Sequence, residues 1–198
     1  MLGFSIPYDN KDGKRDFFSF SVERGPLLFA GSRHTSIDDR VCTGLINAFG
    51  SLNFTFLTGC AGGVDESFRK ALGKSDYAHI SIMACAFPDR IRLSQGILPL
   101  VVVPEGLPPR AALAKRTLWM TALCRLLVLF PSSPMGKGSS LAFRSAIMGS
   151  KPVFIVTKDR PKDSNLYRIF YSSLFGVVEG YWCIPYIYKD TGLCYQIF

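Results

Sequence analysis

The chain has 198 residues, 48% of them hydrophobic and 19% charged, and a formal net charge of +8 at pH 7. That apolar content is enough for one full hydrophobic core, so an intrinsically disordered chain is excluded. The longest apolar runs are far shorter than the about 20 residues that a membrane-spanning helix needs, so we expect no membrane partner. The N-terminal residues show no pattern of a secretory signal, and we therefore expect a cytoplasmic protein.

The cysteines and histidines show no pattern typical of a metal or cofactor site. Six cysteines occur without a C-x-x-C pair, and His34 and His79 stand apart from cysteines or acidic residues at ligand spacing. We expect reduced thiols, no metal and no cofactor. The high net charge favours polyanionic partners such as nucleotides or nucleic acids, although a basic and inert surface would give the same composition.

Apolar patterning predicts one domain over residues 1–198. Alternating apolar residues predict an N-terminal β-hairpin over about residues 4–22. In the core, about residues 27–156, short apolar runs alternate with segments of helical period, which is typical of an α/β fold with an open, mainly parallel sheet and helices on both faces. The expected strands are 27–30, 54–57, 80–86, 97–103, 126–130 and 152–156.

The remaining residues, about 159–198, form a C-terminal extension of different character. We expect a helix over residues 164–175 and an antiparallel hairpin within residues 186–198. Aromatic residues are dense from Tyr181 to the end, which favours a homodimer interface; they would equally serve to cover one end of the sheet within a monomer.

Two apolar runs end abruptly at glycine and small polar residues and are followed by a helical pattern. A strand delivers backbone amides to a helix N-terminus in this way, and such a place suits an anion. Glycine supplies the backbone conformations and the close approach that these turns need. The residues of the two turns that we expect to hold an anion are Gly31, Ser32, Arg33, Thr58, Gly59, Gly62, Gly63 and Asp65.

A third glycine-rich segment, residues 131–140, lies between a predicted strand and a helix expected over residues 141–148. Its spacing does not match the G-x-x-x-x-G-K-[ST] P-loop, so ATP hydrolysis of that type is not indicated. Ser139 and Ser140 suit the cap of that helix, with amides that would hold a phosphate. Cations of the preceding helix would lie near the same sheet edge or on a solvated helix face. The expected binding residues here are Arg110, Arg116, Gly136, Lys137, Gly138, Ser139 and Ser140.

The order of these three segments resembles the SLOG superfamily, which joins the DNA-processing protein A (Smf) proteins and the LOG-like proteins. The resemblance covers about residues 27–156 and is best to the Smf branch, through its Gly-Ser-Arg opening and its Gly-x-Ala-x-Gly-Val/Ile-Asp turn. Arg116 looks like part of that branch's arginine-rich segment. The resemblance implies a Rossmann-like fold and a nucleotide or single-stranded DNA as ligand.

The chain departs from the LOG hydrolase motif P-G-G-x-G-T-x-x-E. When Pro134, Gly136 and Gly138 are aligned with it, Met135 stands at one glycine and Ala142 at the glutamate. The resemblance therefore does not support nucleoside-phosphate hydrolysis by that route.

Three functions stay open, in this order. The first is binding of a nucleotide or nucleotide-derived ligand, with its phosphates at the three glycine-rich segments. The second is single-stranded nucleic-acid binding of the Smf kind, supported by the positive charge and by Arg110, Lys115 and Arg116. The third is an enzyme acting at a glycosidic or phosphate bond with Asp65 or Glu66 as the acid, although Asp65 would also serve to buttress the turn by accepting backbone hydrogen bonds.

Overall fold

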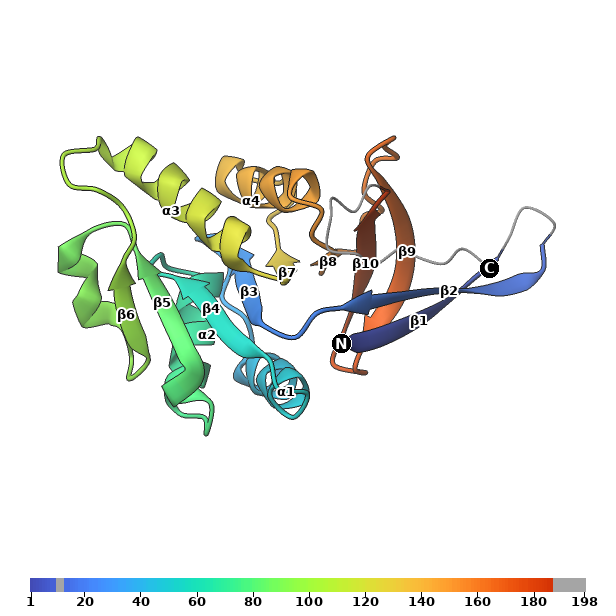
Figure 1. Cartoon of the computed structure of the whole chain (residues 1–198), viewed down its shortest axis with the longest axis horizontal. Helices are drawn as coiled ribbons and strands as arrows, with labels where there is room; N and C mark the ends of the chain where they lie inside the picture. Colours follow the sequence, from blue (N-terminus) through green and yellow to red (C-terminus); the bar gives the residue numbers. More distant parts are fainter. Residues whose placement is uncertain (10–12, 187–198) are drawn as a thin grey trace.

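The computed structural model describes residues 1–9 and 13–186 and contains one large mixed sheet (Figure 1). Six strands run parallel, in the order β6-β5-β4-β3-β7-β8, and antiparallel β10 and β9 extend the sheet beyond β8. The predicted α/β, Rossmann-like, mainly parallel sheet is thus confirmed. Its strands are β3 (Pro26–Gly31), β4 (Thr55–Gly59), β5 (Ser81–Cys85), β6 (Leu98–Val101), β7 (Leu126–Phe130), β8 (Val153–Ile155), β9 (Tyr167–Leu174) and β10 (Val178–Pro185).

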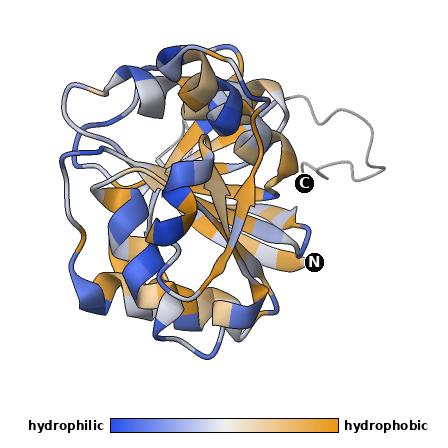
Figure 2. Ribbon diagram, turned by 90° about the vertical axis from the view of Figure 1, so that its left-hand side faces the viewer, coloured by the Kyte–Doolittle hydropathy of each residue, from blue (hydrophilic) through white to orange (hydrophobic). Residues whose placement is uncertain are grey.

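Helices cover both faces of this sheet because its strands are apolar on both sides. Leu27 and Phe29 of β3 pack into one hydrophobic cluster with α1 and α2, whereas Leu28 packs into a second cluster with α3 and α4. Figure 2 shows the apolar strands at the centre and polar residues on the helices around them. The helices are α1 (Asp39–Gly50), α2 (Val64–Gly73), α3 (Pro109–Leu123) and α4 (Lys137–Met148), with short 3-10 turns η1 (Ala78–Ile80) and η2 (Pro88–Leu93).

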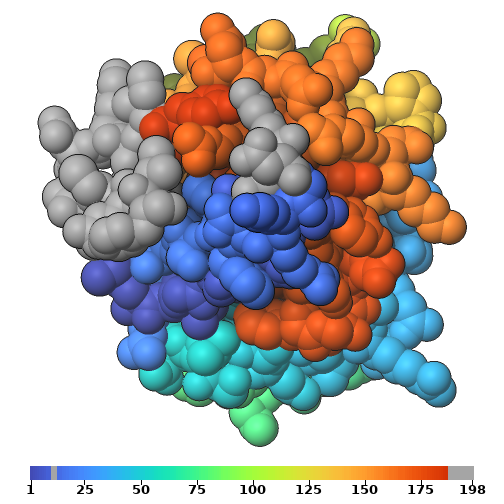
Figure 3. Space-filling view, turned by 90° about the vertical axis from the view of Figure 1, so that its right-hand side faces the viewer, coloured from blue at the N-terminus to red at the C-terminus, as the bar shows by residue number. Residues whose placement is uncertain are grey.

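The predicted N-terminal hairpin is present as β1 (Leu2–Asp9) and β2 (Arg15–Val22). It packs against the C-terminal strands, so that opposite ends of the chain lie side by side (Figure 3). The rings of Phe4 and Phe20 lie 4.7 and 5.0 Å from that of Trp182, which is fully buried on β10. The hairpin therefore completes the hydrophobic cluster on the α1–α2 side.

The helix expected over residues 164–175 is wrong, because this segment forms β9 and pairs with β10. Tyr167 and Ile169 pack on the α4 side of the sheet, whereas Phe170 and Leu174 pack on the side of the N-terminal hairpin. This alternation has the period of two that a strand requires. The hairpin expected within residues 186–198 lies outside the described residues, apart from Tyr186.

Candidate functional site at the carboxyl edge of the sheet

The three glycine-rich turns follow neighbouring strands, β4, β3 and β7, and so meet at the carboxyl edge of the sheet. The order of the strands reverses between β3 and β7, since β4 to β6 lie on one side of β3 and β7 and β8 on the other. Ligands of open α/β sheets bind outside the carboxyl ends of the strands at such a switch point. At Gly31 the ends of β3 and β7 approach so closely that a Cβ would collide with the carbonyl of Phe130.

The turn after β3 is locked against the start of α2. The amide of Val64 donates to the Ser32 carbonyl at 3.0 Å, and the hydroxyl of Ser67 accepts from the amide of Ile37 at 3.0 Å. Gly63 has φ +62°, and a Cβ at this position would collide with the backbone of Ser32. The two predicted turns therefore form one interlocked unit.

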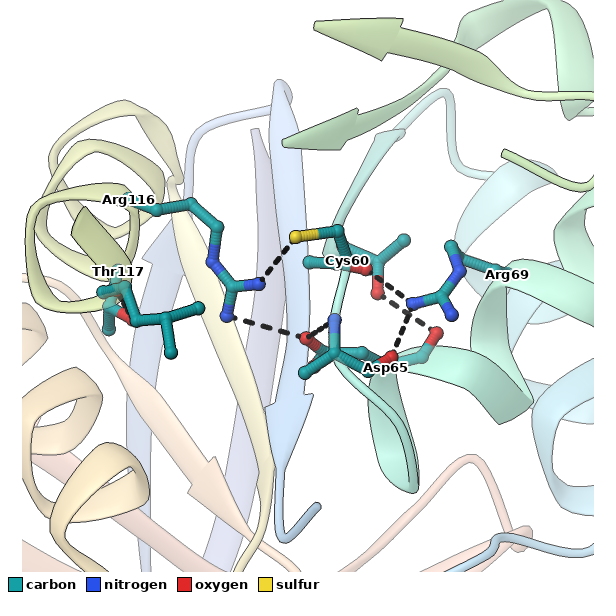
Figure 4. A network of polar contacts seen from close by, with 9 residues as sticks. Cys60, Asp65, Arg69, Arg116 and Thr117 are labelled. Atoms are coloured by element: carbon teal, nitrogen blue, oxygen red, sulfur yellow. Dashed lines mark hydrogen bonds and ion pairs between the residues drawn. The ribbon is translucent and has the colours of Figure 1, made fainter. Parts of the chain in front are cut away.

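A buried polar network lies behind the turn after β4 (Figure 4). Arg116 Nη2 lies 3.5 Å from Asp65 Oδ2, and both side chains are more than nine-tenths buried. The other terminal nitrogen of Arg116, Nη1, donates to Cys60 Sγ at 3.2 Å, and the amide of Ala61 donates to Asp65 Oδ2 at 3.3 Å. Gly59 is needed beneath this network, because a Cβ there would collide with the Asp65 carboxylate.

Arg69 holds the carbonyl groups of the same turn. Its Nη1 donates to the carbonyls of Gly59 and Ala61, each at 2.7 Å, and its Nε donates to the Leu93 carbonyl at 3.1 Å. Arg69 is not among the site residues that the sequence predicts. In the sequence, Arg69 stands out only as a cation on the apolar side of α2, next to Phe68 and Leu72.

Burial shifts the pKa values of the charged groups in this network. Burial raises the pKa of the Asp65 carboxyl, while the charges of Arg116, Arg69 and Arg33 act in the opposite direction. Burial likewise lowers the pKa of Arg69. Since the charges of these guanidinium groups favour the ionised carboxylate of Asp65, removing them would leave a buried charge without compensation.

The turn after β4 is thus largely satisfied from within the protein. Thr58 is buried, and its hydroxyl donates to the Asp65 carbonyl at 3.4 Å. The carboxylate of Asp65 accepts a hydrogen bond from the amide of Ala61 and pairs with Arg116. This is the arrangement expected if Asp65 buttresses the turn. Of the predicted residues in this turn, Gly62 is the exposed one.

The turn after β7 differs, because α4 begins earlier than expected. Gly136 is the N-cap and α4 starts at Lys137, so Ser139 and Ser140 lie within the first helical turn and do not cap it. The Ser140 amide donates to the Gly136 carbonyl at 2.9 Å, and the Ser139 side chain packs inward. The buried face of α4 therefore begins at Ser139, within the first turn of the helix. No side chain of the described residues caps this helix, so its first amides point out of the sheet edge unpaired by a side chain.

The cations predicted for the site divide into two groups. Arg33 after β3, Arg110 at the start of α3 and Lys137 at the start of α4 are exposed. Arg116 is buried and engaged with Asp65. Only the first group is free to meet an external anion at this edge.

The part of the chain that the structure describes holds no group of three His, Cys, Asp or Glu side chains arranged to bind a metal ion. Its helices are also too short or too polar to cross a membrane. The five described cysteines are free and buried.

No protein-family model and no curated protein matches the chain. Among solved structures it is similar to DNA processing protein A from Helicobacter pylori, which has a single-stranded DNA binding mode; the identity is 18%, the TM-score 0.53, and 71% of this chain and 66% of that one are covered. It is also similar to DNA processing protein A (DprA) from Streptococcus pneumoniae, with 20% identity, a TM-score of 0.53, and 69% and 51% coverage. The chain thus spans between half and two thirds of these structures and shares the Rossmann-like fold of DNA processing proteins.

Proposed function

We propose that the carboxyl edge of the sheet binds the phosphate backbone of single-stranded DNA. The observation that carries this proposal is the switch point between β3 and β7, where the uncapped start of α4 lies beside exposed cations. The fold shared with DNA processing proteins supports the same ligand, since one of those proteins has a single-stranded DNA binding mode.

Each group has a distinct part in such a complex. The guanidinium of Arg33 is suited to a bidentate contact with a phosphate, and Lys137 supplies a point charge directly at the helix start. The amides of the first turn of α4 add the positive end of the helix dipole. Arg110 lies further along the edge, at the start of α3, so a ligand that reaches from Lys137 to Arg110 must be extended, as a single strand is.

A nucleotide or nucleotide-derived ligand is the second candidate. The space around Gly138 favours it, because a Cβ at this position would meet nothing within 4 Å and the first turn of α4 is open to a single phosphate group. In this case Arg33 and Lys137 would contribute to affinity and Arg110 would not.

Hydrolysis is not proposed, because the acids near the glycine turns are engaged. Asp65 pairs with Arg116, and Glu66 pairs with Lys70 at 2.6 Å. Ala142, at the position of the LOG glutamate, is buried in the cluster between α4 and the sheet, so no carboxylate stands there.

The test is fluorescence anisotropy of a labelled oligothymidylate of about 20 nucleotides over a series of salt concentrations. We expect affinity to fall steeply with salt, with a slope that decreases by about 0.7 for each phosphate contact removed. The double variant Arg33→Ala/Lys137→Ala should lose most of the affinity. Arg24→Ala is the matched control, since Arg24 is exposed but precedes β3 at the opposite end of the strands.

Competition separates the two candidates. If mononucleotides displace the oligonucleotide at equal phosphate concentration, and Arg110→Ala has no effect, the ligand is a single nucleotide. Binding that does not depend on salt, or that the control variant weakens as much as the site variant does, contradicts both proposals.

A further inference from the structure

One layer of the molecule carries cations without acids. From residue 106 to residue 158 the sequence contains no Asp or Glu, although it contains eight Lys and Arg residues. This stretch builds α3, β7, α4 and β8, and therefore both helices on one face of the sheet (Figure 1). The cations are Arg110, Lys115, Arg116, Arg125, Lys137, Arg144, Lys151 and Lys158.

Some of these cations form ion pairs within the protein. Arg116 pairs with Asp65, and Arg125 pairs with Glu23 at 3.4 Å. Lys115 on α3 and Arg144 on α4 are exposed, and the described residues provide no ion pair for either. These two charges project from the outer surface of the helical layer, apart from the carboxyl edge where Arg110 and Lys137 lie.

The same outer surface exposes aliphatic side chains. Leu118 of α3 is 44% exposed, and Met148 of α4 is 78% exposed. The hydroxyls of Thr121 and Ser145 lie 2.7 Å apart and fix the register of the two helices. The two helices therefore lie side by side, each with one of these aliphatic groups in its second half.

We propose that this outer face of α3 and α4 is a docking surface for an acidic, amphipathic segment of a partner protein. Charge complementarity identifies the partner, because Lys115 and Arg144 each lie one helical turn before Leu118 and Met148, and no acid of α3 or α4 opposes an approaching carboxylate. An amphipathic helix binds through apolar anchors on one face, and its acidic residues would meet these two cations. The proposal is independent of the carboxyl-edge site.

The chemistry of the surface distinguishes a protein from other polyanions. Single-stranded nucleic acids stack on exposed aromatic rings, and amphipathic membrane surfaces use Trp and Phe with Leu. The exposed apolar groups of this face are Leu and Met, and methionine is adaptable enough to pack against a peptide.

The neighbouring acids are already engaged. Glu179 on β10 accepts a hydrogen bond from the hydroxyl of Tyr171 at 2.8 Å, and Asp159 beyond β8 accepts one from the hydroxyl of Ser133 at 3.2 Å. Both acids lie outside the two helices, so neither divides the docking surface.

The test uses two labelled synthetic peptides of about 18 residues with the same Glu and Leu composition. In one peptide Leu recurs at i, i+3, i+4 and i+7, and in the other the order is scrambled. Binding is measured by fluorescence anisotropy at about 0.1 M salt, where the Debye length is about 10 Å. We expect the patterned peptide to bind more tightly than the scrambled one.

Variants locate the binding. Lys115→Glu/Arg144→Glu should weaken patterned-peptide binding about tenfold or more, and Leu118→Gln/Met148→Gln about tenfold. The matched charge control is Arg40→Glu/Lys74→Glu, exposed on the α1–α2 side, and the matched apolar control is Phe17→Gln, exposed on the hairpin. Both controls should change the affinity less than about twofold.

Four results would overturn the proposal. They are no binding of the patterned peptide at 1 mM, equal binding of both peptides, an equal loss in the charge control, and a phosphatidylserine vesicle that binds through this face while the peptide does not. The last result would assign the face to an anionic membrane.

Discussion

Arg116 and Asp65 come from helices on opposite faces of the sheet, yet their side chains meet at 3.5 Å beyond the end of β4. Arg116 passes over Gly59, where the missing Cβ leaves room for the contact. The pair therefore ties the α3–α4 layer to the α1–α2 layer at the candidate site. We expect this pair to hold the glycine turns in place.

Replacing Arg116 with Met should destabilise the fold by about 3–5 kcal/mol, because a buried carboxylate is left without its partner. Adding Asp65→Asn should recover part of that loss, since the uncompensated charge is removed. The free energy of unfolding from urea titration measures both effects. Arg125→Met serves as the control: its pair with Glu23 is exposed and is worth about 0–1 kcal/mol. Equal losses in the two single variants would contradict this role of the pair.

Two glycine substitutions should have opposite effects on stability. Gly59→Ala places a Cβ against the Asp65 carboxylate and 2.9 Å from Arg116 Cζ, so we expect a loss of about 2 kcal/mol or more. Gly138→Ala lies in α4 with open space around its Cβ and should stabilise the protein by about 0.5–1 kcal/mol. Thermal unfolding distinguishes them, and a stable Gly59→Ala protein would show that the network has room to move.

The N-terminal hairpin should depend on its aromatic contacts with β10. Phe20→Ala removes a buried ring that contacts Phe4 and Trp182, and we expect a loss of about 3 kcal/mol. Phe17→Ala on the outer side of the same strand should change stability by less than about 0.5 kcal/mol. Urea unfolding followed by the fluorescence of Trp119 and Trp182 would report both. Similar values for the two variants would mean that the hairpin adds little to the core.

The buried thiol of Cys124 should make the protein sensitive to alkali. Burial raises the pKa of Cys124 from 9.0 to about 12. Below pH 9 the thiol is protonated in both states; above it the unfolded state loses the proton first, so the stability contribution is lost as the pH rises from 9 to 12. Between pH 8 and pH 10, the unfolding free energy of the wild type should fall by about 1 kcal/mol more than that of Cys124→Ala. Equal decreases would contradict the raised pKa.

The sequence predicted the parallel core because its strands are continuous apolar runs bounded by glycine and proline. The local apolar pattern was enough to predict β3, β4 and β7. It therefore also predicted that the three glycine turns meet at one edge of the sheet. It failed for residues 167–174, where Tyr-Arg-Ile-Phe-Tyr carries apolar side chains at both helical and strand spacings. The strand was decided by its pairing with β10, a contact that local sequence does not reveal.

The site was harder to predict than the fold. Nothing in the sequence marks Arg69 and Arg116 as buried, because a cation on a helix usually points to solvent. Their burial depends on carbonyls and a carboxylate supplied by a turn from another part of the chain. For the same reason the sequence could not show that the turn after β4 uses its own polar groups, whereas the start of α4 does not.

The placement of β10 between β8 and β9 also affects how the chain folds during translation. Translation produces β1 and β2 before β10, but the indole on which they rest belongs to Trp182 of β10. Until β10 has emerged, the apolar side of the hairpin lacks this cover, and β8 lacks its antiparallel neighbour. A chain truncated before residue 182 would therefore leave the apolar side of the hairpin and the edge of β8 open to aggregation.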